Sequence, residues 1–265
     1  MGQIVTLTTD WGYSDFFIGK VKGRLSSLIP DVQVVDITHG IRDYNLMDTA
    51  FIVANTCFDF PEGTIHIIDV CSTETPANPF VIVECEGQYF ICADNGVLSI
   101  VIGDRDYNSV QITYMQDSNF FTFAAYNLFC YIAQELAAGT PISELGSERE
   151  RLNRARTPLY MYSENTLHLV VIYIDAYGNG YLNIKYDEFE RIRAGRDFYI
   201  TMAGQQRSKM RISRSYADSY LDAGSTGIIL TVSATGHLQL AMSNNPASKM
   251  LDLAVTNNTI FIDFA

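Results

Sequence analysis

The chain has 265 residues, of which 48% are hydrophobic and 18% charged, and its formal net charge is −12. This length suits one large domain or two modest ones, and the composition excludes an intrinsically disordered chain. The negative charge argues against a nucleic-acid partner, because proteins that bind a phosphate backbone usually carry a basic face. No apolar stretch approaches the ~20 residues needed to cross a bilayer, so we expect no membrane association.

The cysteines indicate a reducing compartment. None of the five belongs to a CxxC pair and most lie in apolar runs, which is typical of buried free thiols. The N-terminal residues enter a strand-like run directly, without a basic region followed by an apolar one. We therefore expect a cytoplasmic protein.

The first part of the chain alternates between strand and helix patterns. Apolar residues at helical spacing, such as Phe17, Val21 and Leu25, mark the helices. The predicted elements are strands at 4–9, 32–37, 64–70, 80–85, 89–93 and 110–115, and helices at 15–29, 46–58, 95–102 and 123–138. This alternation predicts an α/β domain over residues 1–150, with a mainly parallel sheet flanked by helices.

The charged segment 147–157 lacks an apolar stripe and is the best candidate for a linker. Beyond it the pattern becomes β-rich. The predicted strands are 167–174, 198–203, 209–212, 227–232, 237–242 and 260–263, and only 246–253 is expected to be helical. Short strands separated by turns favour a small barrel or sandwich. We expect a compact C-terminal β-barrel domain over residues 158–265.

Three carboxylates fall where predicted strands end. Asp10 follows the first strand, Asp36 lies near the end of the second, and Asp69 ends the third. Ligands of open parallel sheets bind beyond the carboxyl ends of the strands, where an acid can hold ribose hydroxyls or an ammonium group. Each acid alone could equally be a helix N-cap or a turn residue. Asp15 opens the next helix and could cap it, contact a ligand, or do both.

A glycine-rich stretch in the second part is a further candidate. Asp175, Tyr177 and Asn179 follow an apolar run, and they form either a simple turn or a site that stacks and hydrogen-bonds a purine. The four histidines make no helical HxxxH pair, and no Cys or acid lies at metal-ligand spacing, so no metal is expected. GxSxG, GxGxxG and P-loop patterns are absent from the sequence.

Several separate stretches resemble one enzyme family in both order and spacing. They are TTDWGYSD at 8–15, which is similar to a TDFGxxD opening, VDITH at 35–39, FPEGTIH at 60–66, ADNGVL at 93–98 and IDAYGN at 174–179. These stretches resemble the S-adenosyl-L-methionine (SAM) hydroxide adenosyltransferases, which are related to enzymes that make fluorinated and chlorinated adenosine. The resemblance covers nearly the whole chain. It implies an α/β domain, a C-terminal β-barrel, and a homotrimer with the ligand between one subunit's large domain and a neighbour's barrel.

The resemblance also implies a reaction and its site residues. Water or halide would displace methionine at the 5′ carbon of the ribose, with no cofactor beyond SAM itself. Carried over by position, the substrate-binding residues are Asp10 at the ribose hydroxyls, Tyr44 beside the sugar or methionine, Asp15 and Asp175 at the methionine amino group, Tyr177 and Asn179 at the adenine, Ser233 at the methionine, Asn245 and Ala247 at the adenine edge, and Ser72 and Ala125.

The chain departs from the family pattern at its catalytic motifs. In the hydrolases the third strand leads into DPGVGTxR, and FHGRD precedes a long helix. Here Asp69 matches the aspartate, but VCST at 70–73 replaces PGVG and no arginine follows before Phe80. Ala124 and Tyr126 stand where the histidine and arginine would be. Asp69 is the remaining catalytic candidate, and a lone carboxylate with an ordinary pKa of ~3.9 is a poor base at neutral pH.

Three functions therefore stay open at the level of sequence. The first is a SAM hydrolase that forms adenosine, with an altered catalytic set. The second is a catalytically silent protein that binds SAM or adenosine. The third is a different small-molecule enzyme on the same scaffold, using Asp69, Cys71 or Ser72, although Cys71 has no evident base beside it. A halogenase is no better supported, because Ala125 offers only its backbone N–H at the halide position.

Overall fold

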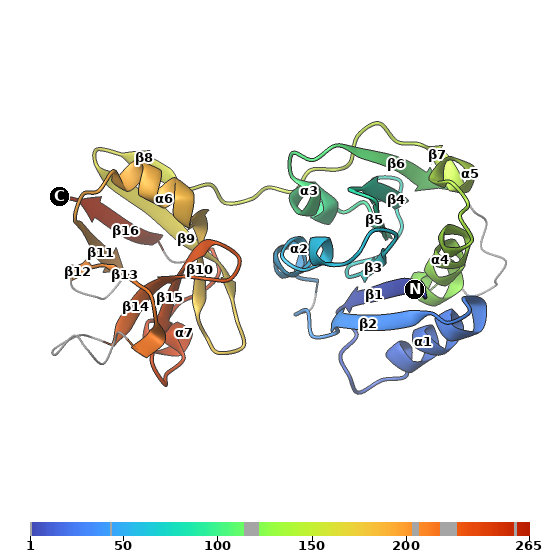
Figure 1. Ribbon diagram of the computed structural model, residues 1–265, viewed down its shortest axis with the longest axis horizontal. Coiled ribbons are helices and arrows are strands. Elements are labelled where there is room, and N and C mark those ends of the chain that lie inside the picture. The colour runs from blue at the N-terminus through green and yellow to red at the C-terminus, as the bar shows by residue number, and fades with distance from the viewer. Residues whose placement is uncertain (1, 43, 114–121, 203–206, 218–226, 257–258) are drawn as a thin grey trace. The chain divides into compact units, whose positions relative to one another are not determined.

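The computed structural model describes residues 2–42, 44–113, 122–202, 207–217, 227–256 and 259–265 (Figure 1). The chain divides into two compact units, Met1–Arg156 and Thr157–Ala265. The first unit combines helices with a sheet, and the second is built almost entirely of strands. Within the described residues, no helix is long and apolar enough to cross a membrane.

The sheet of the first unit is mixed, which corrects the expectation of a mainly parallel sheet. Its strands, in the order β2-β1-β3-β5-β4-β6-β7, are β1 (Ile4–Thr9), β2 (Gln33–Thr38), β3 (Ile65–Asp69), β4 (Phe80–Cys85), β5 (Gln88–Ala93), β6 (Tyr107–Ile112) and β7 (Gly146–Glu148). The pairs β1–β2, β1–β3 and β3–β5 are parallel, and the pairs β4–β5, β4–β6 and β6–β7 are antiparallel. The reversal begins at the predicted hairpin, where Glu86 and Gly87 both have positive φ, as a tight two-residue turn requires.

Helices cover both faces of this sheet. They are α1 (Phe17–Leu28), α2 (Leu46–Ala54), α3 (Val97–Ile102), α4 (Cys130–Ala137) and α5 (Ile142–Leu145), with a 3-10 turn at Cys57–Asp59 and a π-helical turn at Ala125–Phe129. One apolar core packs α1 and α4 against Leu7 and Ile67, and another packs α2 and α3 against Ile68 and Val83. Neighbouring strand residues face opposite sides, so Ile67 and Asp69 share the α1/α4 face. The predicted single helix over 123–138 is thus a π-helical turn that continues into α4.

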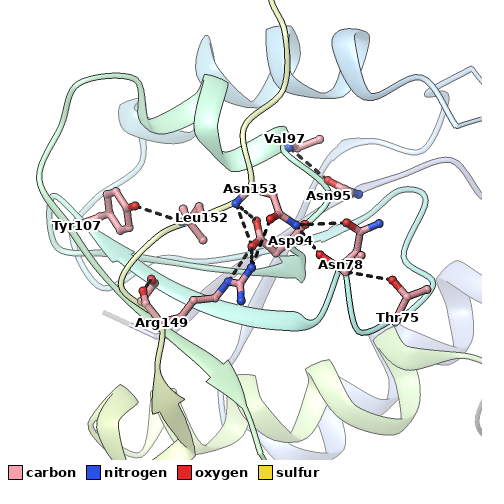
Figure 2. A network of polar contacts seen from close by, with 11 residues as sticks. Thr75, Asn78, Asp94, Asn95, Val97, Tyr107, Arg149, Leu152 and Asn153 are labelled. Carbon is pink, nitrogen blue, oxygen red and sulfur yellow. Dashed lines mark hydrogen bonds and ion pairs between the residues drawn. The ribbon is translucent and has the colours of Figure 1, made fainter.

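The charged segment that follows β7 is bonded to the first unit (Figure 2). Arg149 Nε donates to Asp94 Oδ2 at 2.8 Å, and the Asn153 backbone N–H donates to Asp94 Oδ1 at 3.0 Å. Asn153 Nδ2 also donates to Ala77 O at 2.7 Å. Asp94 is only 1% exposed, so these partners compensate for the loss of its hydration. The segment predicted as a linker is therefore anchored by a buried carboxylate.

The second unit contains a barrel-like sheet. Its strands are β8 (Met161–Ser163), β9 (Thr166–Ile174), β10 (Gly180–Lys185), β11 (Phe198–Met202), β12 (Ser208–Met210), β13 (Ile212–Ser213), β14 (Ile228–Val232), β15 (His237–Met242) and β16 (Thr259–Phe264). The order is β12-β11-β16-β9-β10-β15-β14-β13, with β8 beside β9. Only Arg211 separates β12 from β13 in the chain, so the two ends of the sheet are brought near each other and the sheet is nearly closed.

Several elements of this unit differ from the sequence predictions. Helix α6 (Tyr186–Arg193) was not expected, because its surface is highly charged and only Phe189 is buried. Strand β10 was not expected either, although its residues alternate between buried and half-buried. The predicted helix at 246–253 is reduced to the single turn α7 (Ala247–Met250).

Candidate functional site

Asp69 is the last residue of β3 and is only 7% exposed. It lies opposite Thr9 in the parallel pairing of β1 with β3. Burial raises the pKa of Asp69 to about 6; the nearby Ser72 hydroxyl opposes the rise, the negative charge of Asp10 adds to it, and a hydrogen bond from Trp11 opposes it. A carboxylate with this pKa is largely ionised at pH 7 and accepts a proton more readily than an ordinary aspartate. Burial thus makes Asp69 a stronger base than its ordinary pKa would indicate, and its catalytic role stays a prediction.

Asn95, next to Asp94 in the chain, holds the loop after β3. Asn95 Nδ2 donates to Val70 O at 3.1 Å and to Cys71 O at 3.4 Å. Cys71 adopts a positive φ of 51°, so the chain turns sharply just after Asp69. Ser72 Oγ is buried beside Asp69, but among the described residues it makes no hydrogen bond of ordinary geometry. Asn95 thus fixes the backbone from which the Ser72 side chain projects.

An aromatic cluster packs against Asp69. Trp11 Nε1 donates to Asp69 Oδ2 at 3.1 Å. The indole ring meets Phe123 edge-on at 5.2 Å between centroids and stacks on His39 at 6.0 Å. His39 Nδ1 in turn lies 2.8 Å from Thr9 Oγ1. These side chains come from the ends of β1 and β2 and from the segment before the π-helical turn, so the fold gathers them at one end of the sheet.

The other acids at this end of the sheet differ in their surroundings. Asp10 is half-buried and close enough to Asp69 to influence its pKa. Asp36 forms an ion pair with Lys22, whose Nζ lies 2.6 Å from Asp36 Oδ2, and it also approaches His39. Although burial opposes the change, Lys22 and His39 lower the pKa of Asp36. Asp36 is thus paired with a cation, whereas Asp10 lies close enough to Asp69 for the two negative charges to interact.

Asp15, Tyr44 and Ala125 occupy three different settings. Asp15 is exposed, and α1 begins at Phe17 without a side-chain cap, so the capping interpretation of Asp15 is wrong. Tyr44 is largely exposed and adopts a positive φ of 60°. Ala125 is fully buried as the first residue of the π-helical turn, an irregularity that is frequent at functional sites.

The position of the expected arginine, Tyr126, is covered by cations from α1. Lys20 Nζ lies 4.3 Å from the centroid of the Tyr126 ring, and the Arg24 guanidinium lies 5.3 Å from it. Arg24 also stacks over Tyr131, at 4.6 Å from the ring centroid. The positive charges of Lys20 and Arg24 therefore lie beside the π-helical turn, but they pack over aromatic rings.

In the second unit, the predicted turn is organised by Asp175. The Asp175 carboxylate accepts from the backbone N–H groups of Tyr177 and Asn179 at 3.0 and 2.9 Å. It also accepts from Asn179 Nδ2, and more weakly from the Tyr181 hydroxyl and Gln239 Nε2. Both carboxylate oxygens are thus engaged in shaping the turn. Contact of Asp175 with an amino group stays a prediction.

A cavity of about 530 Å³ opens beside this turn. Its lining residues are Tyr177, Asn179, Tyr216, Met242, Ser243, Asn244, Asn245 and Pro246. Three of them were expected from the sequence to meet adenine, and Ala247 follows directly in the chain. Tyr177 is 83% exposed and can offer a ring face, while Asn179 is 6% exposed and fixed by Asp175. The volume suits a small organic ligand.

Gly178 connects the turn after β9 to the segment that carries Pro246. Its φ is +83°, and its carbonyl accepts from the Ser248 backbone N–H at 2.7 Å. A Cβ added at Gly178 would lie 2.6 Å from Pro246 Cβ and 2.8 Å from Ser248 Oγ. No other residue type fits this position without displacing the loop before α7.

Ser233 does not line the cavity. It lies in the turn between β14 and β15, where its hydroxyl donates to His237 O at 3.0 Å and pairs with Thr235 Oγ1 at 2.9 Å. The cavity lies at the other end of β15, beside Met242. The structure of this unit alone therefore separates Ser233 from Tyr177 and Asn179. Among the described residues, no group of three or more His, Cys, Asp or Glu is placed to hold a metal ion.

Both units match models of one protein family. Residues 5–146 match the SAM hydroxide adenosyltransferase N-terminal domain, and residues 169–259 match the C-terminal domain. The chain belongs to the SAM hydroxide adenosyltransferase family. The resemblance drawn from the short motifs is confirmed.

Known relatives match nearly the whole chain, and a solved structure shares its fold. An (R)-S-adenosyl-L-methionine hydrolase of Methanocaldococcus jannaschii is 24% identical, covering 95% of this chain and 92% of the relative. A fluorinase of Nocardia brasiliensis is 25% identical, with coverage of 90% and 89%. The crystal structure of an uncharacterized conserved protein from Thermotoga maritima shares the fold, with a TM-score of 0.85 at 22% identity, covering 98% of this chain and 100% of that one.

Trp11 was not expected from the sequence to contact Asp69. His39 has a structural role at this site, because it supports the ring that contacts Asp69. Trp11 was noted only as part of a motif, although a single tryptophan after a strand-end acid was a signal worth following. Its partner Asp69 is 58 residues away in the sequence, so no local pattern revealed the contact.

Proposed function

We propose that this family member binds SAM and transfers its 5′-adenosyl group to water, forming adenosine and methionine. The observation that carries the proposal is the buried carboxylate of Asp69, whose pKa is raised to about 6. A base of this strength is mostly ionised at neutral pH and still accepts a proton readily. The names of the relatives, SAM hydrolase and fluorinase, support adenosyl transfer as the class of reaction.

In the proposed reaction, Asp69 accepts a proton from a water molecule. The water oxygen forms a bond to C5′ of the ribose while the bond from C5′ to the sulfonium sulfur breaks. The electron pair of that bond stays on sulfur, so methionine leaves as a neutral thioether and the proton rests on Asp69 before it passes to solvent. The negative charges of Asp10 and Asp69 and the nearby aromatic faces also favour a sulfonium cation.

We assign the remaining contacts by unit. In the first unit, Asp10 holds the ribose hydroxyls. In the second unit, Tyr177 stacks on the adenine, and Asn179 and Asn245 hydrogen-bond its edge, which is supported by the cavity that they line. The proposal includes the homotrimer implied by the family resemblance, which sedimentation analysis tests. It also includes a cytoplasmic location, supported by five cysteines that are all free thiols.

Incubation of the purified protein with SAM, with and without chloride, tests this function. Nucleosides are followed by liquid chromatography and mass spectrometry, and ligand binding is measured separately by calorimetry. We expect adenosine above the no-protein control, lost in Asp69→Asn and retained in Asp104→Asn, which changes an exposed acid of the same unit.

The other outcomes distinguish the alternatives. Saturable binding of SAM or adenosine without product would identify a silent binding protein. A chlorinated nucleoside in the chloride arm would identify a halogenase. Absence of both binding and product would rule out the proposal and leave a different small-molecule enzyme.

A further inference from the structure

Trp11 is the only tryptophan of the chain, and its indole N–H points at Asp69. The 3.1 Å separation between Nε1 and Oδ2 is a normal hydrogen bond to a carboxylate. Among the described residues, this N–H is the one side-chain donor with ordinary hydrogen-bond geometry to Asp69. An indole N–H only donates and does not titrate in the physiological range, so it favours the ionised acid at every pH.

The indole is held in place from several directions. Phe123 meets it edge-on at 5.2 Å, Phe17 lies tilted at 6.2 Å, and His39 stacks on it at 6.0 Å. His39 is fully buried, and its carbonyl accepts from the Gly12 backbone N–H at 2.8 Å, which fixes the loop that carries Trp11. Although Trp11 is only half-buried, these contacts keep its donor aimed at one oxygen.

We propose that Trp11 is a positioning residue for Asp69, which orients the carboxylate and holds it ionised so that its other oxygen can accept the proton of the reacting water. A phenylalanine, as in the TDFG motif that this stretch resembles, would fill the space without donating a hydrogen bond. The inference rests on the proposed function for the role of Asp69 as base. The Trp11–Asp69 contact itself does not depend on that function.

Other ionisable groups surround this pair, and a pH-based test must account for them. They are Asp10 just after β1, His39 after β2, Cys92 of β5 and Cys130 of α4, which in turn feels the charge of Arg24. Burial raises the pKa of both thiols, that of Cys130 to about 12, so they stay protonated near neutral pH. His39 also stacks on the indole ring, so its effect on the indole signal must be separated from that of Asp69.

The single tryptophan permits a direct measurement. In the ¹⁵N-labelled protein, the one indole ¹H–¹⁵N signal is followed from pH 4.5 to 8. We expect it to shift with a midpoint near 6, as the acceptor loses its charge below that pH. The shift should vanish in Asp69→Asn and persist in both His39→Gln and the control Asp104→Asn, which changes an exposed acid of the same unit. A wild-type signal that does not titrate, or a titration that survives Asp69→Asn, would overturn the inference.

A second variant guards against poor folding of the first. In Trp11→Phe, the ¹³C signal of the Asp69 carboxyl should titrate about one pH unit higher than in the wild type, because a hydrogen bond to the charged form has been lost. The pH profile of adenosine formation should move in the same direction. An unchanged midpoint would contradict the positioning role. Failure of the proposed function removes adenosine formation but leaves both titrations, so the two ideas fail separately.

Discussion

Replacing Asp69 with asparagine should stabilise the first unit at neutral pH. The folded-state pKa of about 6 lies above the ordinary value of 3.8, so between these pH values the folded protein holds a proton that the unfolded chain has lost. The free energy of unfolding therefore falls as pH rises through this window, and the deficit persists above it. At about 1.4 kcal/mol per pH unit, the buried charge costs about 2 to 3 kcal/mol at pH 7. Asparagine removes that charge and keeps an oxygen to accept from Trp11.

Urea unfolding monitored by Trp11 fluorescence measures this cost in the first unit, because no other tryptophan contributes. We expect Asp69→Asn to exceed the wild type by about 2 to 3 kcal/mol at pH 8, with the difference shrinking towards zero near pH 4. Asp104→Asn, at an exposed position, serves as the control and should change little. An equal gain at both pH values, or a loss of stability at pH 8, would refute the assignment of a costly buried charge to Asp69.

Three further outcomes follow from the same structure. Adenosine formation should rise with pH around a midpoint of about 6 as Asp69 ionises, and a rate–pH profile that is flat from pH 5 to 8 would contradict its role as base. Asp94→Ala should lower the free energy of unfolding by about 3 to 5 kcal/mol, because it leaves Arg149 and the Asn153 backbone N–H without the buried carboxylate they bind. Asp94→Asn should cost less in the same urea assay. Gly178→Ala should weaken adenosine binding, as measured by calorimetry, because the added Cβ would clash with Pro246. Gly195→Ala, also at positive φ but with no atom within 4 Å of the added Cβ, should not weaken it. Equal effects of the two variants would show that steric contact is irrelevant.

Local patterns predicted much of the secondary structure because each depends on nearby residues. Strand β1 was predicted from a strand-like run of residues, and the hairpin at Glu86 and Gly87 from its turn residues. Helix α6 was missed because a charged helix that buries only Phe189 carries little apolar signal. The mixed sheet was missed because a hairpin fixes how its own two strands pair, but not which strands lie on either side.

For the site as well, local patterns predicted some features and tertiary contacts decided others. The sequence by itself placed acids at strand ends and Tyr177 and Asn179 beside Gly178, and its motifs carried the resemblance to the family. Only the tertiary structure decided how these groups behave. The raised pKa of Asp69 comes from its burial in the folded unit, and its indole donor comes from a residue 58 positions earlier in the chain. Burial and long-range contacts depend on which elements pack together, and a local pattern of residue types does not encode that.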